Sequence, residues 1–541
     1  MASSSAKTRP SMTRRELLRK TGRTAAGVAA GIAAGAGAAA WPEFGRALVA
    51  AAAPKSGGTI TISQSVDINT LHPWTGTLNV WKVIKTNVYD QLSYQDPVTL
   101  EFKPRLAKSF EWTDGNTSLV VTLPSGVRFH NGEPLTADDV KFTLDSIRDP
   151  KTGSWLRGFI APIQDVQVLD PTHVKIKTDA VENQLIPAFA YVDITPRSQG
   201  TDLARKTPIG SGPYRFVEWV PNDRVTLQRA PRYWNEAGAG HVERIVLKPV
   251  TELQTRISQL LAGDVDVVYD FSLLEVPRLR ADRRAAVSVV PPVDQMFVMY
   301  LNARKPPFNK LEVRQAVAYA LDRDAFIKNF LAGQGRLDNS PFTPSHWAFD
   351  PKTEKAYTYN PDQVGRLLEK AGYPKGQGLN FTLLTPSGYP EFTQLSTMIQ
   401  ATFASLGYRP PIEEVDIGQW AARLNQTKDF FAAVDYPPRG SADPALTYSA
   451  GLFFPPVPAN YNGLTPESIP GYVPAVHRGA TAIQRPVRKV AYYSVQELWN
   501  AYLPGPVFCH RSTAHAAVQA VKAFVPHPAF QQRFTDVWLD R

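Results

Sequence analysis

One short stretch near the C-terminus brings together residue types that bind metals or act as nucleophiles. Cys509 and His510 are adjacent, and His515 follows five residues later. A metal site needs several such ligands at spacings that let them converge on one ion. The spacing Cys-His-x4-His matches no established set of metal ligands. We therefore expect no metal and no cofactor, and leave open that these imidazoles help to hold a small chelate.

A serine nucleophile is the second chemistry to consider. Ser211 lies between Gly210 and Gly212, but a nucleophile elbow needs Gly-x-Ser-x-Gly and a helix directly after it. The run here is too short, and Pro213 stands where that helix would begin. His-Glu-x-x-His and Walker-type loops are also absent from the sequence. We expect no enzyme, with a secreted hydrolase as the alternative of another class.

The first 53 residues have the layout of an export signal. Arg14 and Arg15 form a twin-arginine pattern before Glu-Leu-Leu, and residues 24–41 are almost entirely alanine and glycine. Residues 50–52 are alanines, the small residues that a signal peptidase recognises. This predicts export by the twin-arginine route, with cleavage near Ala53. The alternative is an uncleaved membrane anchor, for which the glycines make a poor spanning helix.

Removal of that signal changes the charge balance. The whole chain has 59 Lys and Arg against 49 Asp and Glu, a net charge of +10. Residues 1–53 hold eight of the basic residues and two of the acidic ones, so the remainder carries only +4. This balance gives no reason to expect nucleic acid as a partner. The chain also has one cysteine, so it forms no internal disulfide, and its core must hold the fold.

Strands and helices alternate along the remaining chain, which predicts an α/β or α+β fold with more than one domain. Alternating apolar residues and flanking turns predict strands at 59–62, 118–123, 166–169, 174–177 and 265–269. Helical periodicity and capping residues predict helices at 137–148, 251–261, 362–370 and 392–406, with another beginning after Asn309. From 436 to 486 the periodicity is lost, and we expect a long ordered surface segment.

Several blocks, in order, resemble the bacterial extracellular solute-binding proteins of family 5, the peptide and nickel receptors of ABC importers. The longest runs from Pro104 through Gly-Val-Arg-Phe-His-Asn-Gly at 126–132 to Leu-Thr-Ala-Asp-Asp-Val at 135–140. Further blocks are Ile-Gly-Ser-Gly-Pro-Tyr at 209–214, Leu-Ala-Gly-Asp-Val-Asp at 261–266, residues 301–323 and residues 359–374. The resemblance covers residues 56–541 and is weakest between 436 and 488.

The resemblance implies a two-lobed fold of the type II periplasmic-binding-protein class with a hinge of two crossovers. Lobe I would comprise residues 56–292 and 512–541, with an inserted subdomain at about 80–205, and lobe II residues 293–511. Ligand would shift the lobes toward a closed state because only that state lets it touch both of them. The implied protein is a periplasmic monomer that passes its solute to an inner-membrane ABC permease, and delivery to a sensor is the alternative.

The family's peptide receptors place an aspartate near an Asp-Pro pair to bind the ligand's ammonium. The matching stretch here contains Asp435, Tyr436, Arg439 and Asp443, but lacks the family's usual tryptophan. An arginine can bind a carboxylate through two parallel hydrogen bonds. Our hypothesis is that Arg439 faces the cleft with Asp443 or Asp435, with Tyr436 beside them. The alternative is that Arg439 lies on the surface, paired with a neighbouring aspartate.

Aromatic rings are the candidates for ligand side-chain pockets. Trp74 follows the first strand, Tyr389 precedes a helix, and Phe297 lies near the first crossover. For each of these the alternative is packing in the core. Ser211 is a candidate hydrogen-bond donor to ligand, or part of a tight turn that glycine permits. A peptide-like ligand is the leading interpretation, and an opine, an oligosaccharide, a metal chelate and haem stay open.

Overall fold

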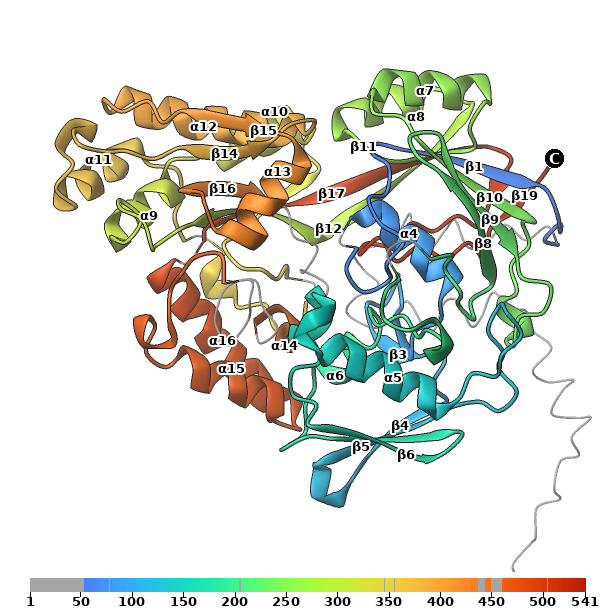
Figure 1. Cartoon of the computed structure of the whole chain (residues 1–541). Helices are drawn as coiled ribbons and strands as arrows, with labels where there is room; N and C mark the ends of the chain where they lie inside the picture. The colour runs from blue at the N-terminus through green and yellow to red at the C-terminus, as the bar shows by residue number, and fades with distance from the viewer. Residues whose placement is uncertain are drawn as a thin grey trace, which may run out of the picture. The chain divides into compact units, whose positions relative to one another are not determined.

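The computed structural model describes residues 53–76, 78–203, 206–344, 346–354, 356–435, 443–448, 460–503 and 505–541 (Figure 1). The predicted signal with Arg14 and Arg15 lies outside the described residues, as do Tyr436 and Arg439. Residues 50–541 form one compact unit. Among the described helices, none is both long and apolar enough to cross a membrane.

A mixed sheet runs through this unit and is built mainly from segments far apart in sequence. Its described strands follow the order β15 (Ile412–Val415), β14 (Leu383–Pro386), β16 (Ala432–Asp435), β12 (Ala285–Leu301), β17 (Val507–Val518), β11 (Val267–Phe271), β1 (Thr59–Gln64), β10 (Arg244–Pro249), β9 (Arg224–Arg229) and β8 (Tyr214–Val220), with β13 (Gly335–Leu337) paired to β17. The long strands β12 and β17 run antiparallel and side by side (Figure 1). They therefore join the strands before residue 285 to those after 301.

A second, antiparallel sheet contains β4 (Ser109–Thr113), β5 (Ser118–Thr122), β7 (His173–Lys177) and β6 (Asp165–Asp170) in that order. Helix α5 (Ala137–Arg148) packs on it and begins at a capping box, in which Thr136 and Asp139 satisfy each other's backbone N–H groups. The strands predicted at 166–169 and 174–177 are present as the antiparallel pair β6 and β7, and the helix start predicted at 137 is confirmed. Short pairs complete the described strands: β2 (Ser93–Gln95) with β3 (Phe102–Pro104), and β18 (Val521–Lys522) with β19 (Trp538–Leu539).

The other described α-helices connect and cover these strands. They are α4 (Asn79–Val88), α6 (Leu185–Ala188), α7 (Leu253–Ala262), α8 (Val276–Ala281), α9 (Leu311–Tyr319), α10 (Arg323–Phe330), α11 (Pro361–Lys370), α12 (Pro390–Ser405), α13 (Ile417–Ala422), α14 (Pro444–Tyr448), α15 (Tyr472–Thr481) and α16 (Arg485–Tyr502). Helix α7 ends at Gly263, whose φ of 85° is the left-handed conformation expected of a C-terminal glycine. The helix predicted after Asn309 is also present as α9.

Two sequence predictions need correction. The strand predicted at 265–269 is β11 at Val267–Phe271, because the turn after Gly263 extends two residues further. The stretch 436–486 was predicted to be a surface segment that lacks helical periodicity. It instead contains α14, α15 and the start of α16. Pro474 lies in the first turn of α15, where proline is tolerated, and Gly479 packs against the Tyr492 ring. This proline and this glycine are therefore compatible with the helical hairpin of α15 and α16.

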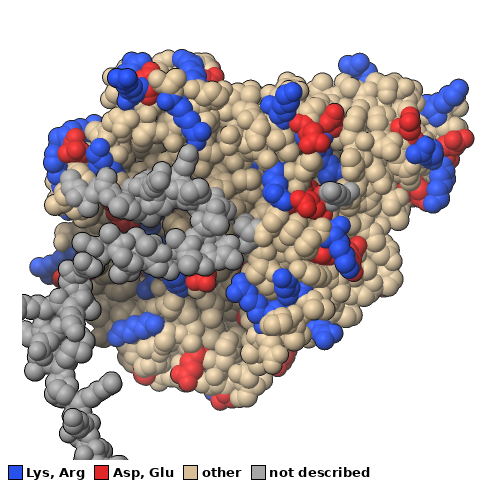
Figure 2. All heavy atoms as spheres, turned by 180° about the vertical axis from the view of Figure 1, so that it is seen from behind, with Lys and Arg blue, Asp and Glu red and all other residues tan. Residues whose placement is uncertain are grey.

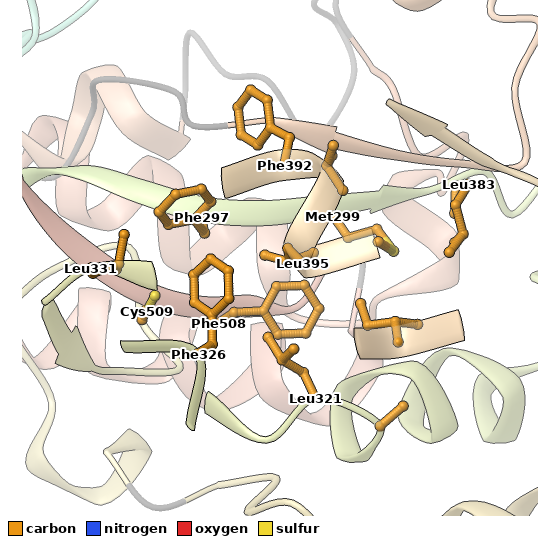
Figure 3. Close-up of a cluster of buried hydrophobic side chains, with 14 of the residues drawn as sticks. Phe297, Met299, Leu321, Phe326, Leu331, Leu383, Phe392, Leu395, Phe508 and Cys509 are labelled. Carbon is orange, nitrogen blue, oxygen red and sulfur yellow. The ribbon is translucent and has the colours of Figure 1, made fainter. Parts of the chain in front are cut away.

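The buried side chains form several clusters. The Ile60 cluster draws on residues 60–269 and 517–539, and the Trp74 cluster on residues 74–203 together with Leu446. The Phe297 cluster draws on residues 257–434 and 508–516 (Figure 3), and the Tyr300 cluster on residues 298–499. Burial of these side chains supplies the main stabilisation of a chain that has no disulfide. On the face drawn in Figure 2, positive and negative side chains are interspersed, in keeping with the small net charge of residues 54–541.

Candidate functional site

The predicted crossovers, near residues 292 and 511, lie within β12 and β17. The register of this pair shifts at two places: between Val290 and Gln295, where β12 contains extra residues, and between Phe297 and Val298. Pro291 and Pro292 fall in the first irregular stretch, and proline has no N–H group to donate to a sheet. The ladder is thus interrupted where the chain is predicted to hinge. The lobe boundaries themselves stay a prediction.

An ion pair ties the second crossover to the neighbouring strand β11. Arg511 donates from Nη2 to both carboxylate oxygens of Asp270, each at 3.1 Å. Asp270 has a left-handed φ of 47° and lies at a break in the β11–β17 register. The Asp270 N–H donates to Nδ1 of His515 at 3.2 Å. Burial lowers the pKa of His515 to about 4, so the ring is neutral and free to accept this bond.

Asp338 is a buried acid beside the same crossover. It follows β13, which pairs with β17, and its carboxylate is fully buried. Burial raises its pKa to about 8, and the nearby guanidinium of Arg336 only partly opposes this. The Arg336 Nε lies 3.7 Å from the carboxylate, too far for a hydrogen bond, and the same guanidinium also pairs with Glu354. Arg336 thus lies near two acidic side chains. Because its pKa is about 8, Asp338 is mainly protonated at neutral pH.

The structure does not bring together the three residues that cluster in the sequence near the C-terminus. Cys509, His510 and His515 lie on β17 but have different surroundings. Cys509 lies in the Phe297 cluster (Figure 3), and burial raises the pKa of its thiol to about 12. The Nε2 of His510 lies 3.2 Å from the carbonyl oxygen of Pro341, and burial lowers its pKa to about 4. His515 instead contacts Asp270 and Thr513. Across the described ranges, no group of three or more His, Cys, Asp or Glu is placed to hold a metal ion.

Trp74 lies within the cluster named after it. Its ring is fully buried, and Nε1 donates to the carbonyl oxygen of Asp193 at 3.0 Å. The His72 ring contacts it edge-on, with centroids 5.5 Å apart, and Ser154 donates to its backbone oxygen. These contacts favour the core-packing alternative over a ligand pocket. The prediction that Trp74 binds ligand is not tested by them.

Ser211 is held in a tight turn against the end of α4. A Cβ on Gly210 or Gly212 would lie 2.0 or 2.5 Å from backbone oxygens of α4, so both positions require glycine. The Ser211 hydroxyl donates to Asp90 at 3.0 Å, and Arg533 donates to the same carboxylate at 2.6 Å. This arrangement fits the tight-turn alternative, and the ligand role of Ser211 stays a prediction.

Phe297 and Tyr389 are brought together through a third ring. Phe297 is fully buried and meets Phe326 and Phe392 edge-on, with centroid separations of 5.2 and 5.7 Å. Tyr389 precedes α12, is half-buried, and lies 5.5 Å from Phe392. Phe297 points into the interior (Figure 3). Tyr389 is therefore the more accessible of the two.

The acidic candidates lie at opposite ends of the segment that contains Tyr436 and Arg439. Asp435 ends β16, is half-buried, and accepts a hydrogen bond from the Tyr300 hydroxyl at 3.0 Å. Asp443 accepts from Arg488 at 2.6 Å and from the N–H of Ala445 at the start of α14. The carboxylate of Asp443 is thus already neutralised by α16. The ligand roles of Asp435 and Asp443 stay predictions.

Sequence reasoning missed Asp270, Arg511, Asp338 and Arg488. The partners in these pairs lie far apart in sequence. Asp270 and Arg511 are 241 residues apart, and Asp443 and Arg488 are 45 residues apart. Side-chain type alone gives no signal for such pairs. The structure also brings α14 to the Trp74 cluster, because Leu446 is buried there.

Three comparisons bear on this arrangement. Residues 101–451 match the family model described as bacterial extracellular solute-binding proteins, family 5 Middle. The chain is 25% identical over 370 residues to the glutathione-binding protein GsiB of Shigella flexneri serotype 5b (strain 8401), covering 68% of this chain and 71% of that protein. Two solved structures have a TM-score of 0.81 at 21% identity, covering 90% of this chain and 99% of each: DppA from Helicobacter pylori with the peptide STSA, and AgaA from A. tumefaciens R10 with agropinic acid. This likeness confirms the predicted type II periplasmic-binding-protein-like fold of mixed α/β class.

Proposed function

Because the chain belongs to family 5 of the bacterial extracellular solute-binding proteins, we propose that it captures a peptide or peptide-like solute in the periplasm for an ABC importer. The match of residues 101–451 to the family model carries this proposal. The similarity to peptide-bound DppA and to a glutathione-binding protein supports a peptide-like ligand. The protein acts as a monomer, partners the importer's permease, and performs no catalysis.

Asp435, which the structure describes, and Arg439, which the sequence supplies, support a zwitterionic ligand. Burying a charged ligand between lobes requires paired charges, since an unpaired buried charge is costly. Asp435 offers a half-buried carboxylate at the end of β16, steadied by Tyr300. The sequence supplies Arg439 four residues later as the partner for the ligand's carboxylate. Tyr389, half-buried before α12, remains a candidate ring for a ligand side chain.

Mass spectrometry of the protein purified under native conditions from the periplasm identifies the ligand class. We expect a bound peptide or peptide derivative, recovered intact. Recovery of an opine would favour the alternative that AgaA exemplifies, whose structure contains agropinic acid. Hydrolysis of added peptides by the protein would contradict a pure binding role and favour the secreted-hydrolase alternative.

The Arg439→Ala variant tests the proposed carboxylate contact. Loss of a bidentate arginine–carboxylate pair should weaken binding of the identified ligand by about tenfold or more, because a charge-assisted pair of bonds disappears. Isothermal titration calorimetry measures the affinity. Arg366→Ala, at an exposed position on α11, is the matched control and should bind like the wild type. Unchanged affinity in the Arg439→Ala variant would remove Arg439 from the site.

A further inference from the structure

The side chain of Asn183 reaches from the loop before α6 to the C-terminal end of α15. Its Nδ2 donates to the carbonyl oxygens of Ala480 and Ala482, at 2.6 and 2.9 Å. Its backbone N–H also donates to Ala480 O, at 3.0 Å. Three hydrogen bonds thus converge on two carbonyls that are almost 300 residues away in sequence.

Those two carbonyls lie at the C-terminal end of a helix, where backbone carbonyl groups need hydrogen-bond donors from outside the helix. The last four carbonyls of a helix have no partner within the helix, and they carry its negative dipole end. Arg488 of α16 donates to the carbonyl of Gly479 at 2.9 Å, so the hairpin caps that position itself. Asn183 caps Ala480 and Ala482. The end of α15 is therefore completed by a residue from a different part of the chain.

The two sides of this contact belong to different cores. Helix α6, which begins two residues after Asn183, buries Leu185 in the Trp74 cluster. Helix α15 buries Tyr472 in the Tyr300 cluster. Asn183 precedes β12 and α15 follows it, so the contact joins predicted lobe I to predicted lobe II. Leu446 of α14, buried in the Trp74 cluster, makes a second contact of the same kind.

We infer that Asn183 is a latch, a positioning residue whose bonds to Ala480 and Ala482 hold the two lobes in the closed arrangement. This inference rests on the proposed function, because it assigns the latch to the lobe closure that captures solute. When the lobes separate, these bonds pass to water, so the latch lowers the free energy of the closed state alone. The apparent dissociation constant then varies inversely with the closed fraction, and Asn183 sets affinity without touching the ligand.

Distance measurement between two spin labels tests the latch without any ligand. The native thiol Cys509 is fully buried, so labels react with introduced cysteines such as Glu111→Cys on β4 and Glu369→Cys on α11, both at exposed positions. Pulsed electron spin resonance then gives the populations of short and long distances. The wild type should show a short-distance population that represents the closed arrangement.

Substitution of Asn183 should shift these populations. Asn183→Asp keeps the shape but directs carboxylate oxygens at two carbonyl oxygens, so we expect the ratio of closed to open molecules to fall about tenfold or more. Asn183→Ala removes the donors without adding repulsion and should give a smaller fall. Asn380→Ala, at an exposed position with no role in the contact, is the matched control. Identical distance distributions in the wild type and the Asn183→Asp variant would overturn the inference.

A second measurement separates the latch from the proposed function. The tetrapeptide Ser-Thr-Ser-Ala, the ligand in the DppA structure, is the calorimetric probe. If it binds the wild type, its affinity should fall about tenfold in the Asn183→Asp variant, with the heat-induced unfolding of the unliganded protein little changed. Equal affinity would contradict the latch. Failure of peptides to bind the wild type would count against the proposed ligand class, while the label distances still decide the latch.

Discussion

At the scale of single residues, burial rather than residue type decides the chemical state of the acidic side chains. Asp435 is half-buried and accepts a hydroxyl bond from Tyr300, whereas Asp443 is paired with Arg488. The Asp338 carboxylate is fully buried, and its neighbour Arg336 also pairs with Glu354. Three aspartates of one chain thus have three electrostatic roles. Of these three, Asp435 and Asp443 are less buried than Asp338.

Asp338 allows a prediction about pH. Its folded-state pKa of about 8 lies above the ordinary value of 3.8, so wild-type stability should fall as pH rises from about 4 to about 8 and then level off. Asp338→Asn carries no ionisable group. The unfolding free energy of the variant relative to that of the wild type should therefore rise over that range, by up to about 6 kcal/mol. Chemical denaturation across pH measures this gain. Asp362→Asn, at an exposed position, is the control, and its unfolding free energy relative to the wild type should not rise comparably with pH. If the difference in unfolding free energy between Asp338→Asn and the wild type did not change with pH, the burial argument would be contradicted.

At the scale of elements, the α15–α16 hairpin is held by contacts to distant segments as well as by its own interface. Arg488 of α16 pairs with Asp443 just before α14, and its guanidinium lies 5.0 Å from the Trp347 ring centroid. Both charged side chains are only 11% exposed. Burial raises the pKa of Asp443, and Arg488 opposes that rise, so the two groups depend on each other.

Breaking this pair from one side should be costly. Arg488→Met leaves the Asp443 carboxylate buried without its partner, and we expect a loss of about 3–5 kcal/mol in unfolding free energy. Adding Asp443→Asn should restore part of the loss, because the orphaned charge is then absent. Urea denaturation of the two single variants and the double variant gives the coupling. Arg478→Met on the exposed face of α15 is the control. A loss of less than about 1 kcal/mol for Arg488→Met would show that the pair does not stabilise the hairpin.

At the scale of the whole molecule, two strands carry the connection between the predicted lobes. β12 and β17 are the long central strands of the large sheet, and their pairing is broken at the Pro291–Pro292 stretch. The Asp270–Arg511 pair and the Asn183 contact each join predicted lobe I to predicted lobe II. A hinge that bends at the irregular pairing and a latch at a distant helix end are a consistent way to close around a solute.

The whole chain also has a predicted destination. Arg14→Lys combined with Arg15→Lys keeps the charge but removes the twin-arginine pattern, so the uncleaved precursor should accumulate in the cytoplasm. Immunoblots of periplasmic and cytoplasmic fractions measure this. Arg19→Lys with Arg23→Lys makes the same number of exchanges outside the pattern and should export normally. Periplasmic recovery of the Arg14 and Arg15 double variant would contradict the route, and a mature N-terminus far from Pro54 would contradict the cleavage site.

The sequence by itself determined the fold class and the family, because these depend on local patterns of residues that can be read from the sequence directly. The capping box at Thr136 and the glycine stop at Gly263 are signals of this kind. Only the tertiary structure decided that Trp74 and Phe297 lie in closed cores, that Asp443 is taken by Arg488, and that Asn183 caps a helix end. These outcomes depend on which distant segments pack together. Burial and pairing are properties of that packing, and no single stretch of sequence encodes them.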